Sequence, residues 1–427
     1  MRKMKDSGVE WIGEIPKDWH ITQTRRLFRN EKNIVGDAAD EYDRLALTLK
    51  GVIKRSKNDS EGLQPEKFEG YQILRQNELV FKMIDLENVN TSRVGLSTYT
   101  GLVSPAYIVL KNDSDDNRYE YYWFMSMYYN EVFNHLGGDG VRSALNVKDM
   151  LSLPIPNISK VQKRMLADYL DSKCSKIDEI IEKQQTIIEK LKEYKLSIIT
   201  EIVTKGLKHN VKMKDSGVRF VDTIPYDWEN RKMITILSTR VVDGPHESPE
   251  LYDRGIPYIS ATAIVNGKID FSLMRGYISK EYCEICDKRY SPQRGDLLVV
   301  KLGASTGQVA IVDTDERFNI WVPLAAVRCN DEALPKFVYY AFQSDYFVRQ
   351  MELSWTFGTQ QTLGVQTIEK LRILLPPIAE QRKIVKFLDT IYDYVGSKIE
   401  KVEKMIEKLE EYKKSLIYEV VTGKKEV

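Results

Sequence analysis

Two stretches of the chain repeat apolar positions every seven residues, as a long amphipathic helix does. In the first stretch, one series of positions comprises Ile177, Gln184, Leu191 and Ile198. A second series, three residues later, comprises Ile180, Ile187 and Tyr194, and Ile181 and Ile188 widen the stripe. Lys and Glu crowd the remaining positions. This heptad pattern predicts a helix whose apolar seam packs against a second helix.

The pattern returns near the C-terminal end. There the seven-residue series comprises Val395, Val402, Leu409 and Leu416, and the later series comprises Lys398, Met405 and Tyr412. The polar Gln184 and Lys398 would weaken a helix pair but could fix its register. The alternative is two unrelated helices, each packed on its own domain. Recurrence of the pattern in both places favours a pair.

A mixed pattern of strands and helices precedes each long helix. Runs rich in β-branched and aromatic residues predict strands at 78–83 and 106–111, and again at 296–302 and 325–329. Helices are predicted at 119–135 and 334–353, each followed by a glycine-containing turn and a short strand. Each half therefore contains an α+β domain of ordinary size.

The ends of the two halves repeat closely. Residues 4–9 (Met-Lys-Asp-Ser-Gly-Val) return at 213–218, and Ile15-Pro16-x-Asp18-Trp19 returns at Ile224, an offset of 209. The segment that begins at Ile188-Glu189-Lys190-Leu191 returns at Ile406 with an offset of 218. The second half thus has nine extra residues in its middle, since 218 exceeds 209 by nine. A duplication with similar ends and different middles implies one scaffold that presents two different surfaces.

These patterns predict an α+β fold with two α+β domains separated by two long helices that form an antiparallel coiled coil, as a pseudo-two-fold internal duplication. The predicted parts are a first domain at 1–157, a central helix at 158–212, a second domain at 213–376 and a C-terminal helix at 377–427. The second helix must fold back to bury its seam against the first. Some 40 to 45 helical residues span roughly 60–70 Å, so the pair would act as a rigid spacer.

Composition excludes several classes of protein. With 42% hydrophobic residues and no apolar run near the roughly 20 residues of a membrane span, the chain is expected to be soluble, with no membrane partner. Four cysteines and a polar N-terminal segment favour a cytoplasmic location. The net charge of +1 means that any nucleic-acid contact must come from local clusters.

The sequence indicates no catalytic or metal site. Leu375-Pro376-Pro377-Ile378 lacks the amide and the aromatic residue of an adenine methyltransferase motif, and Gly303-Ala304-Ser305-Thr306-Gly307 lacks the lysine of a phosphate-binding P-loop. Cys283 and Cys286 have zinc-like spacing but no further ligands nearby, and the segment 279–288 is predicted to be a helix. They are interpreted as structural cysteines, and the chain is not expected to be an enzyme or to hold a cofactor.

Several motifs in this order resemble the specificity subunits of type I restriction–modification enzymes, over essentially the whole chain. One is Gly13-Glu14-Ile15-Pro16-Lys17-Asp18-Trp19, although the second copy has Asp222 and Thr223 in place of Gly and Glu. Another is the helix entry Pro376-Pro377-Ile378-Ala379-Glu380-Gln381; the first copy lacks the Glu but keeps Gln162 and Arg164. A third is the strand Gly295-Asp296-Leu297-Leu298-Val299 before the 303–307 turn.

The resemblance implies a DNA-binding subunit with two target recognition domains. Each would bind one half of a bipartite, asymmetric site in double-stranded DNA, and the helices would set the gap. Two methyltransferase subunits would dock and methylate adenine with S-adenosylmethionine, and two ATP-driven restriction subunits can join in this family. S-adenosylmethionine, ATP and Mg are therefore expected on partners and not on this chain. The alternative is a coiled-coil scaffold that assembles partners without reading DNA sequence.

Candidate DNA-binding residues lie in polar, basic or glycine-rich segments. In the first domain they are Lys50, Lys54, Arg55 and Lys57, in a segment predicted to be a flexible loop, and Arg142 and Ser143. In the second domain they are His246, Lys301, Ser305, Thr306, Gln360 and Gln361. Lysine suits phosphate, arginine pairs with guanine and glutamine with adenine. The alternative for each is ordinary surface or turn chemistry. Trp19 and Trp228 are predicted to be core anchors.

Overall fold

The computed structural model describes residues 2–58, 67–83, 93–136, 144–357 and 361–427. The chain divides into two compact units. Unit 1 comprises Met1–Gln184 and Glu403–Val427, and unit 2 comprises Gln185–Val402. Each unit therefore contains an α+β domain together with part of both long helices, and the units are described separately below.

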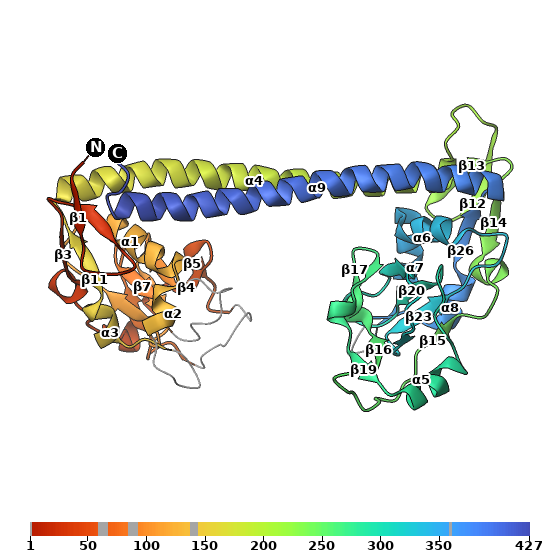
Figure 1. Cartoon of the computed structure of the whole chain (residues 1–427), viewed down its shortest axis with the longest axis horizontal. Coiled ribbons are helices and arrows are strands. Elements are labelled where there is room, and N and C mark those ends of the chain that lie inside the picture. The colour runs from red at the N-terminus through yellow and green to blue at the C-terminus, as the bar shows by residue number, and fades with distance from the viewer. Residues whose placement is uncertain (1, 59–66, 84–92, 137–143, 358–360) are drawn as a thin grey trace. The chain divides into compact units, whose positions relative to one another are not determined.

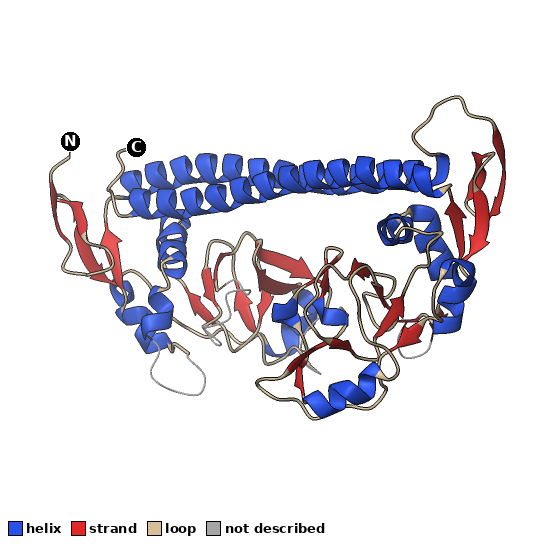
Figure 2. Ribbon diagram, turned by 45° about the vertical axis from the view of Figure 1, so that its right-hand side comes forward, coloured by secondary structure: helices blue, strands red, loops and turns tan. Residues whose placement is uncertain are grey.

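The two long helices are α4 (Lys160–Lys205) and α9 (Ile378–Val421), of 46 and 44 residues. In unit 1 the N-terminal part of α4 runs beside the C-terminal part of α9, where Lys413 Nζ lies 2.6 Å from Asp178 Oδ1. In unit 2 the C-terminal part of α4 runs beside the N-terminal part of α9, where Lys195 Nζ lies 4.3 Å from the centre of the Tyr392 ring. The predicted antiparallel pairing of two long helices is confirmed (Figures 1 and 2).

The seam of the helix pair differs from the predicted one in its second series. From residue 177 to 198, the buried or half-buried positions on α4 are Ile177, Ile181, Gln184, Ile188, Leu191, Lys195 and Ile198. From residue 395 to 416, those on α9 are Val395, Ile399, Val402, Ile406, Leu409, Lys413 and Leu416. The predicted positions Ile180, Ile187, Tyr194, Lys398, Met405 and Tyr412 are exposed in both helices. In each helix the second series therefore begins four residues after the first series, and not three as predicted. Every position of the second series lies one residue later than expected.

Unit 1 is built around two small sheets and three helices. Its elements besides the long helices are β1 (Met4–Asp6), β2 (Glu14–Pro16), β3 (His20–Gln23), β4 (Arg44–Thr48), β5 (Gly51–Arg55), β6 (Gln72–Leu74), β7 (Leu79–Phe81), β8 (Val94–Leu96), β9 (Gly101–Val103), β10 (Ile108–Leu110), α1 (Arg118–Tyr129), α2 (Val132–Leu136), α3 (Val147–Ser152) and β11 (Pro154–Asn157). The sheet β10-β7-β8 packs on α1, with Phe81 and Phe124 edge to face at 5.0 Å. The second sheet has the order β5-β4-β9-β6.

Unit 2 repeats the first of these sheets with an added strand. Its elements are β12 (Met213–Val218), β13 (Val221–Pro225), β14 (Glu229–Lys232), β15 (Val242–Asp243), β16 (Ile256–Ile259), β17 (Ile264–Val265), β18 (Lys268–Ile269), β19 (Gly276–Ile278), α5 (Lys280–Asp287), β20 (Leu297–Val300), β21 (Val309–Ile311), β22 (Asn319–Ile320), β23 (Leu324–Val327), α6 (Pro335–Gln343), α7 (Asp345–Leu353), β24 (Thr356–Phe357), β25 (Gln361–Thr362), α8 (Val365–Lys370) and β26 (Arg372–Leu375). The order β15-β23-β20-β21 corresponds to β10-β7-β8. A separate sheet, β19-β16-β22, belongs to this unit.

Strand register shows the duplication directly. In unit 1, β1 pairs with β2 so that Lys5 faces Ile15, and in unit 2 the equivalent strands place Lys214 opposite Ile224. The strand that closes each domain pairs in the same way: β3 with β11, and β14 with β26. One backbone scaffold therefore recurs in both units.

Each long helix ends against a tryptophan of the other repeat. Gly423, at φ +70°, follows α9, and an added Cβ would lie 3.0 Å from Trp19. Gly206, at φ +76°, follows α4, and an added Cβ would lie 3.2 Å from Trp228. A left-handed glycine is the usual helix terminator, and here it also permits close approach of the indole. Both tryptophans are fully buried, which confirms that they are core anchors.

Two predicted helices are interrupted. The helix expected at 119–135 is divided into α1 and α2 around Glu131, whose φ is +56°. The helix expected at 334–353 is divided at Ser344, whose backbone is extended. The helix expected at 279–288 is confirmed as α5, with the Ser279 hydroxyl accepting a hydrogen bond from the Tyr282 N–H. In the described ranges, no helix combines the length and apolar character of a membrane span.

Candidate nucleic-acid interface

The two units differ most in the stretch of chain between β3 and β7 in unit 1 and between β14 and β20 in unit 2. The offset between equivalent residues is 209 at β3 and β14 and becomes 218 at β7 and β20. The nine extra residues therefore lie between β14 and β20. In unit 1 the corresponding stretch forms the β4–β5 hairpin and β6, whereas in unit 2 it forms β15 to β19 and α5. These stretches are the surfaces in which two copies of one scaffold could recognise different partners.

In unit 2 a buried acid gathers a lysine, an arginine and a histidine. Lys301 Nζ lies 2.7 Å from Asp243 Oδ2, His246 Nε2 lies 3.1 Å from the same oxygen, and Arg289 pairs with Oδ1. Burial opposes ionisation of Asp243, but the hydrogen bond and charge of Lys301, with those of its other partners, hold the pKa of this carboxyl below its ordinary value. The acid is therefore a fixed counter-ion at the end of β15.

The burial of Lys301 limits what its ammonium group can contact. Lys301 and Asp243 are both buried, so the lysine charge is largely matched inside the protein. The side chains of His246 and Arg289 are 69% and 51% exposed, so the cluster presents an imidazole and a guanidinium at the surface. Sequence reasoning missed Arg289, because it follows α5 and reaches Asp243 only through the tertiary fold.

The glycine-bounded turn at 303–307 meets the segment that contains Gln361. The Gly303 N–H donates to the Gln361 carbonyl at 3.2 Å, and the Thr306 hydroxyl donates to the Gly303 carbonyl at 2.7 Å. The Leu363 N–H donates to the Lys301 carbonyl at 2.8 Å. The fold thus brings Gln361 to Lys301 and Thr306, which lie more than 50 positions earlier in the sequence. Ser305 is half-buried in the same turn.

In unit 1 the basic segment is a strand and not the predicted flexible loop. β4 and β5 form a hairpin in which Lys50 is exposed at the turn, next to Leu49, which is 71% exposed. Lys54 Nζ lies 2.7 Å from Asp43 Oδ2, and Lys57 donates to the Ala39 carbonyl at 2.7 Å.

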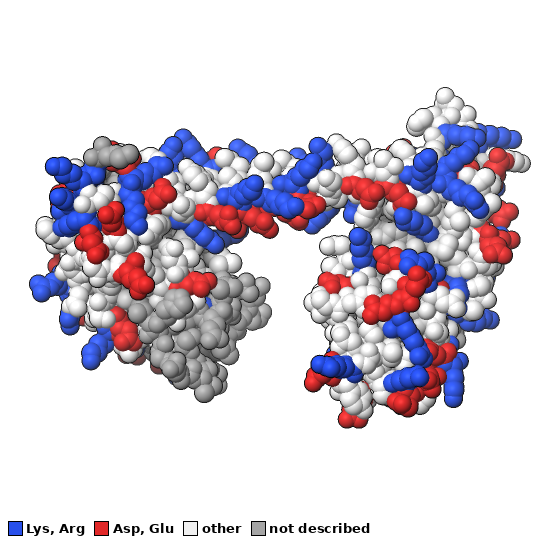
Figure 3. Space-filling view, in the orientation of Figure 1, with Lys and Arg blue, Asp and Glu red and all other residues white. Residues whose placement is uncertain are grey.

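Arg55, the last residue of β5, is half-buried. The other three predicted readers, Arg142, Ser143 and Gln360, lie outside the described residues. In both units, on the face shown in Figure 3, positive and negative side chains are interspersed, and the net charge of the chain is +1.

The cysteines are placed as structural residues. Cys283 and Cys286 are buried on α5, and burial raises the pKa of the Cys286 thiol to about 11. The Cys283 thiol faces Asp287 at 3.8 Å. Within the described ranges, no three His, Cys, Asp or Glu side chains are grouped in a way that could hold a metal ion.

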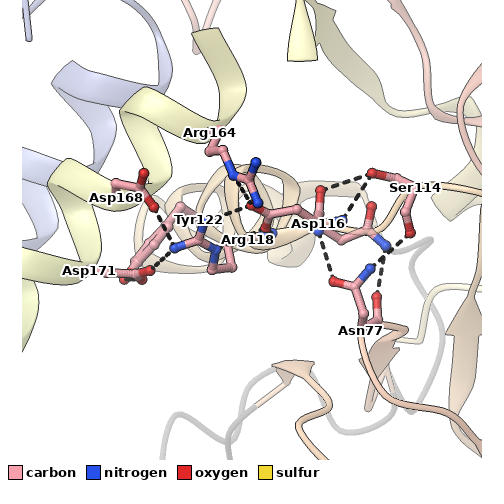
Figure 4. Close-up of polar contacts among 9 residues, drawn as sticks. Asn77, Ser114, Asp116, Arg118, Tyr122, Arg164, Asp168 and Asp171 are labelled. Atoms are coloured by element: carbon pink, nitrogen blue, oxygen red, sulfur yellow. Dashed lines mark hydrogen bonds and ion pairs between the residues drawn. The ribbon is translucent and has the colours of Figure 1, made fainter. Parts of the chain in front are cut away.

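Each domain is fastened to its long helix by a shared acid. In unit 1, Asp171 of α4 accepts hydrogen bonds from Tyr122 at 2.7 Å and from Arg118 at 2.6 Å, both on α1 (Figure 4). In unit 2, Asp389 of α9 accepts from Tyr340 at 2.6 Å and from Lys336 at 2.8 Å, both on α6. Burial first, and then the hydrogen bond to each acid, raises the pKa of both tyrosines far above the ordinary value, so each remains a donor.

Comparison with known proteins agrees with this architecture. Residues 225–411 match the family described as the type I restriction modification DNA specificity domain. A protein assigned as the MjaX type I restriction enzyme specificity subunit of Methanocaldococcus jannaschii is 22% identical over 97% of this chain and 95% of its own length. The EcoBI specificity subunit of Escherichia coli is 24% identical over 66% of this chain and 60% of its own length.

A solved structure shows the same fold. A chain from work on complex assembly and conformational transition of the type I R-M system superposes with a TM-score of 0.66 at 14% identity, covering 95% of this chain and 98% of the other. In sequence and in fold the chain is thus similar to the specificity subunits of type I restriction–modification systems.

Proposed function

We propose that the chain binds a bipartite, asymmetric site in double-stranded DNA, with one α+β domain reading each half. The observation that carries this proposal is the contrast within the duplication. The strand register, the buried tryptophans and the acid that fastens each domain recur, whereas the stretches between β3 and β7 and between β14 and β20 fold differently. Two different surfaces on one scaffold suit recognition of two different half-sites.

In this proposal the antiparallel helices set the gap between the half-sites. Helix α4 has 46 residues, which at 1.5 Å per residue is about 69 Å, or about two turns of duplex DNA. Such a length is compatible with half-sites separated along one face of the duplex.

The catalytic groups would belong to partner subunits. A chain with two copies of one scaffold offers two similar docking surfaces, which suits two copies of one methyltransferase. S-adenosylmethionine would be held by those subunits, and ATP and Mg by two restriction subunits where they join. The complex would act in the cytoplasm, and this chain would contribute specificity and not chemistry.

Selection from a random duplex pool tests the proposal. The chain is combined with its methyltransferase partner, and retained DNA is sequenced. Two short motifs at one fixed gap are expected. Uniform retention, or retention of protein partners alone, would instead support a scaffold that does not read sequence.

A salt titration tests the basic hairpin separately. Replacing Lys54 and Arg55 with Ala is expected to weaken DNA binding and to flatten the dependence of the logarithm of the binding constant on the logarithm of the salt concentration. With fewer phosphates neutralised by the protein, fewer counter-ions leave the DNA on binding. An unchanged slope would exclude phosphate contact by these two side chains. Glu69→Gln, a charge-changing replacement at an exposed site of the same unit, serves as the control.

A further inference from the structure

The acids that fasten the two domains occupy equivalent positions in the duplication. The offset of 218 relates Asp171 to Asp389, Tyr122 to Tyr340, and Arg118 to Lys336. Both the tyrosine bond and the cation bond are kept, at 2.6 to 2.8 Å in both units. We call these two clusters joint 1 (Arg118, Tyr122, Asp171) and joint 2 (Lys336, Tyr340, Asp389).

Each joint links one helix of the domain, α1 or α6, to a long helix through an ion pair and a tyrosine hydrogen bond. In unit 1, Lys163 of α4 and Glu120 of α1 add a further ion pair at 2.7 Å. Tyr122 and Tyr340 are buried, so each places a hydroxyl in a fixed position beneath the domain. A charge-assisted hydrogen bond is short and directional. Sliding or tilting the domain on its helix would therefore break both bonds to the shared acid at once.

The two joints are not equally strong. The guanidinium of Arg118 also pairs with Asp116 at 2.6 Å and with Asp168 at 2.8 Å, so it is held by three acids (Figure 4). Lys336 pairs with Asp389 alone among the ion pairs of the described residues. A planar guanidinium that bonds to several acids loses less conformational entropy per hydrogen bond than a lysine ammonium that bonds to one acid.

We infer that the two joints fix the tilt of each recognition domain on the helix pair and thereby determine how strictly the gap between half-sites is measured. This inference rests on the proposed function. A tilt of about 10° moves a surface about 30 Å away, roughly the diameter of a small domain, by about 5 Å. That displacement exceeds the rise of about 3.4 Å per base pair, so a loose joint would accept neighbouring gaps. Joint 1, held by more acids, is the stricter of the two.

The test uses the complex with the methyltransferase partner and a duplex library. The two half-sites selected by the wild-type chain are kept constant, and the gap between them is varied by single base pairs. Asp171→Ala and Asp389→Ala remove the shared acceptor of each joint. Glu179→Ala and Asp393→Ala, exposed acids further along the same helices, are the matched controls.

Both joint variants are expected to bind neighbouring gaps with the preference for the original gap reduced about tenfold, the factor that one charge-assisted hydrogen bond represents. The half-site sequences should be unchanged. Arg118→Ala should broaden the gap more than Lys336→Ala. The controls should keep the wild-type gap.

The outcome separates a positioning role from a merely structural one. A lower unfolding temperature with an unchanged gap preference would overturn the inference. Should the alanine variants fail to fold, Tyr122→Phe and Tyr340→Phe remove only a hydroxyl and should still broaden the gap. Failure of the wild-type chain to select paired motifs would instead refute the proposed function, so the two results are distinguishable.

Discussion

The position of the helix seam gives a sharp prediction about two adjacent isoleucines on α4. Ile188 is 9% exposed and Ile187 is 42% exposed, although both are isoleucines in the interior of α4. Replacing Ile with Ala removes three carbon groups, worth about 0.8 kcal/mol each when fully buried. At Ile188 nearly all of this, about 2 kcal/mol, is lost, and an unfilled cavity adds about 1 kcal/mol.

At Ile187 the loss is at most about 1.4 kcal/mol, because the side chain is largely solvated and no cavity forms. Alanine's gain in helix propensity is the same at both sites and cancels in the comparison. Ile188→Ala should therefore be less stable than Ile187→Ala by about 1.5 kcal/mol, or roughly 3–6 °C in Tm. Thermal unfolding followed by circular dichroism measures the difference. Equal losses would contradict the observed seam, and a greater loss at Ile187 would mean that the seam follows the three-residue spacing.

Three further predictions concern single side chains. Gly423→Ala should destabilise the chain by at least about 2 kcal/mol, since φ is +70° and the added Cβ would lie 2.5 Å from Pro16; a neutral effect in urea unfolding would contradict this packing. Gly396→Ala, inside α9 with no atom within 4 Å of an added Cβ, should instead stabilise by about 0.5–1 kcal/mol. Lys301→Met should destabilise by roughly 1–3 kcal/mol at pH 7. Because the pKa of Asp243 is lowered in the fold, its contribution is present above its ordinary value of 3.8 and is lost as pH falls through the folded pKa. The wild-type chain should accordingly lose more stability than Lys301→Met in urea unfolding between pH 7 and about pH 3, and parallel losses would argue against the pair.

Hydrophobic periodicity predicted the helix pair but could not choose between adjacent apolar residues. Ile180 and Ile181 are equally hydrophobic, so the first repeat alone does not decide which one faces the partner. The second repeat carried the information: Lys398 and Ile399 occupy the equivalent positions, and only Ile399 suits a seam. Aligning the two heptads residue by residue would have given the observed register.

The candidate site was harder to predict because its residues meet through tertiary structure. Lys301 looked like a free cation in sequence, yet its partner Asp243 lies 58 positions earlier and on another strand. The pairing of the 303–307 turn with Gln361 is likewise non-local. By contrast, the joints had a sequence signal that was overlooked, since a tyrosine and an aspartate recur at the same offset of 218 in both halves.

The claim that the helices measure the distance between two reading domains is tested most directly by lengthening both of them. Inserting one heptad at equivalent sites of α4 and α9 keeps the seam in register and adds about 10.5 Å, close to three base pairs. Selection from random duplexes with the methyltransferase partner should then return the same two half-sites with the gap longer by about three base pairs. An unchanged gap, or altered half-sites, would contradict the account.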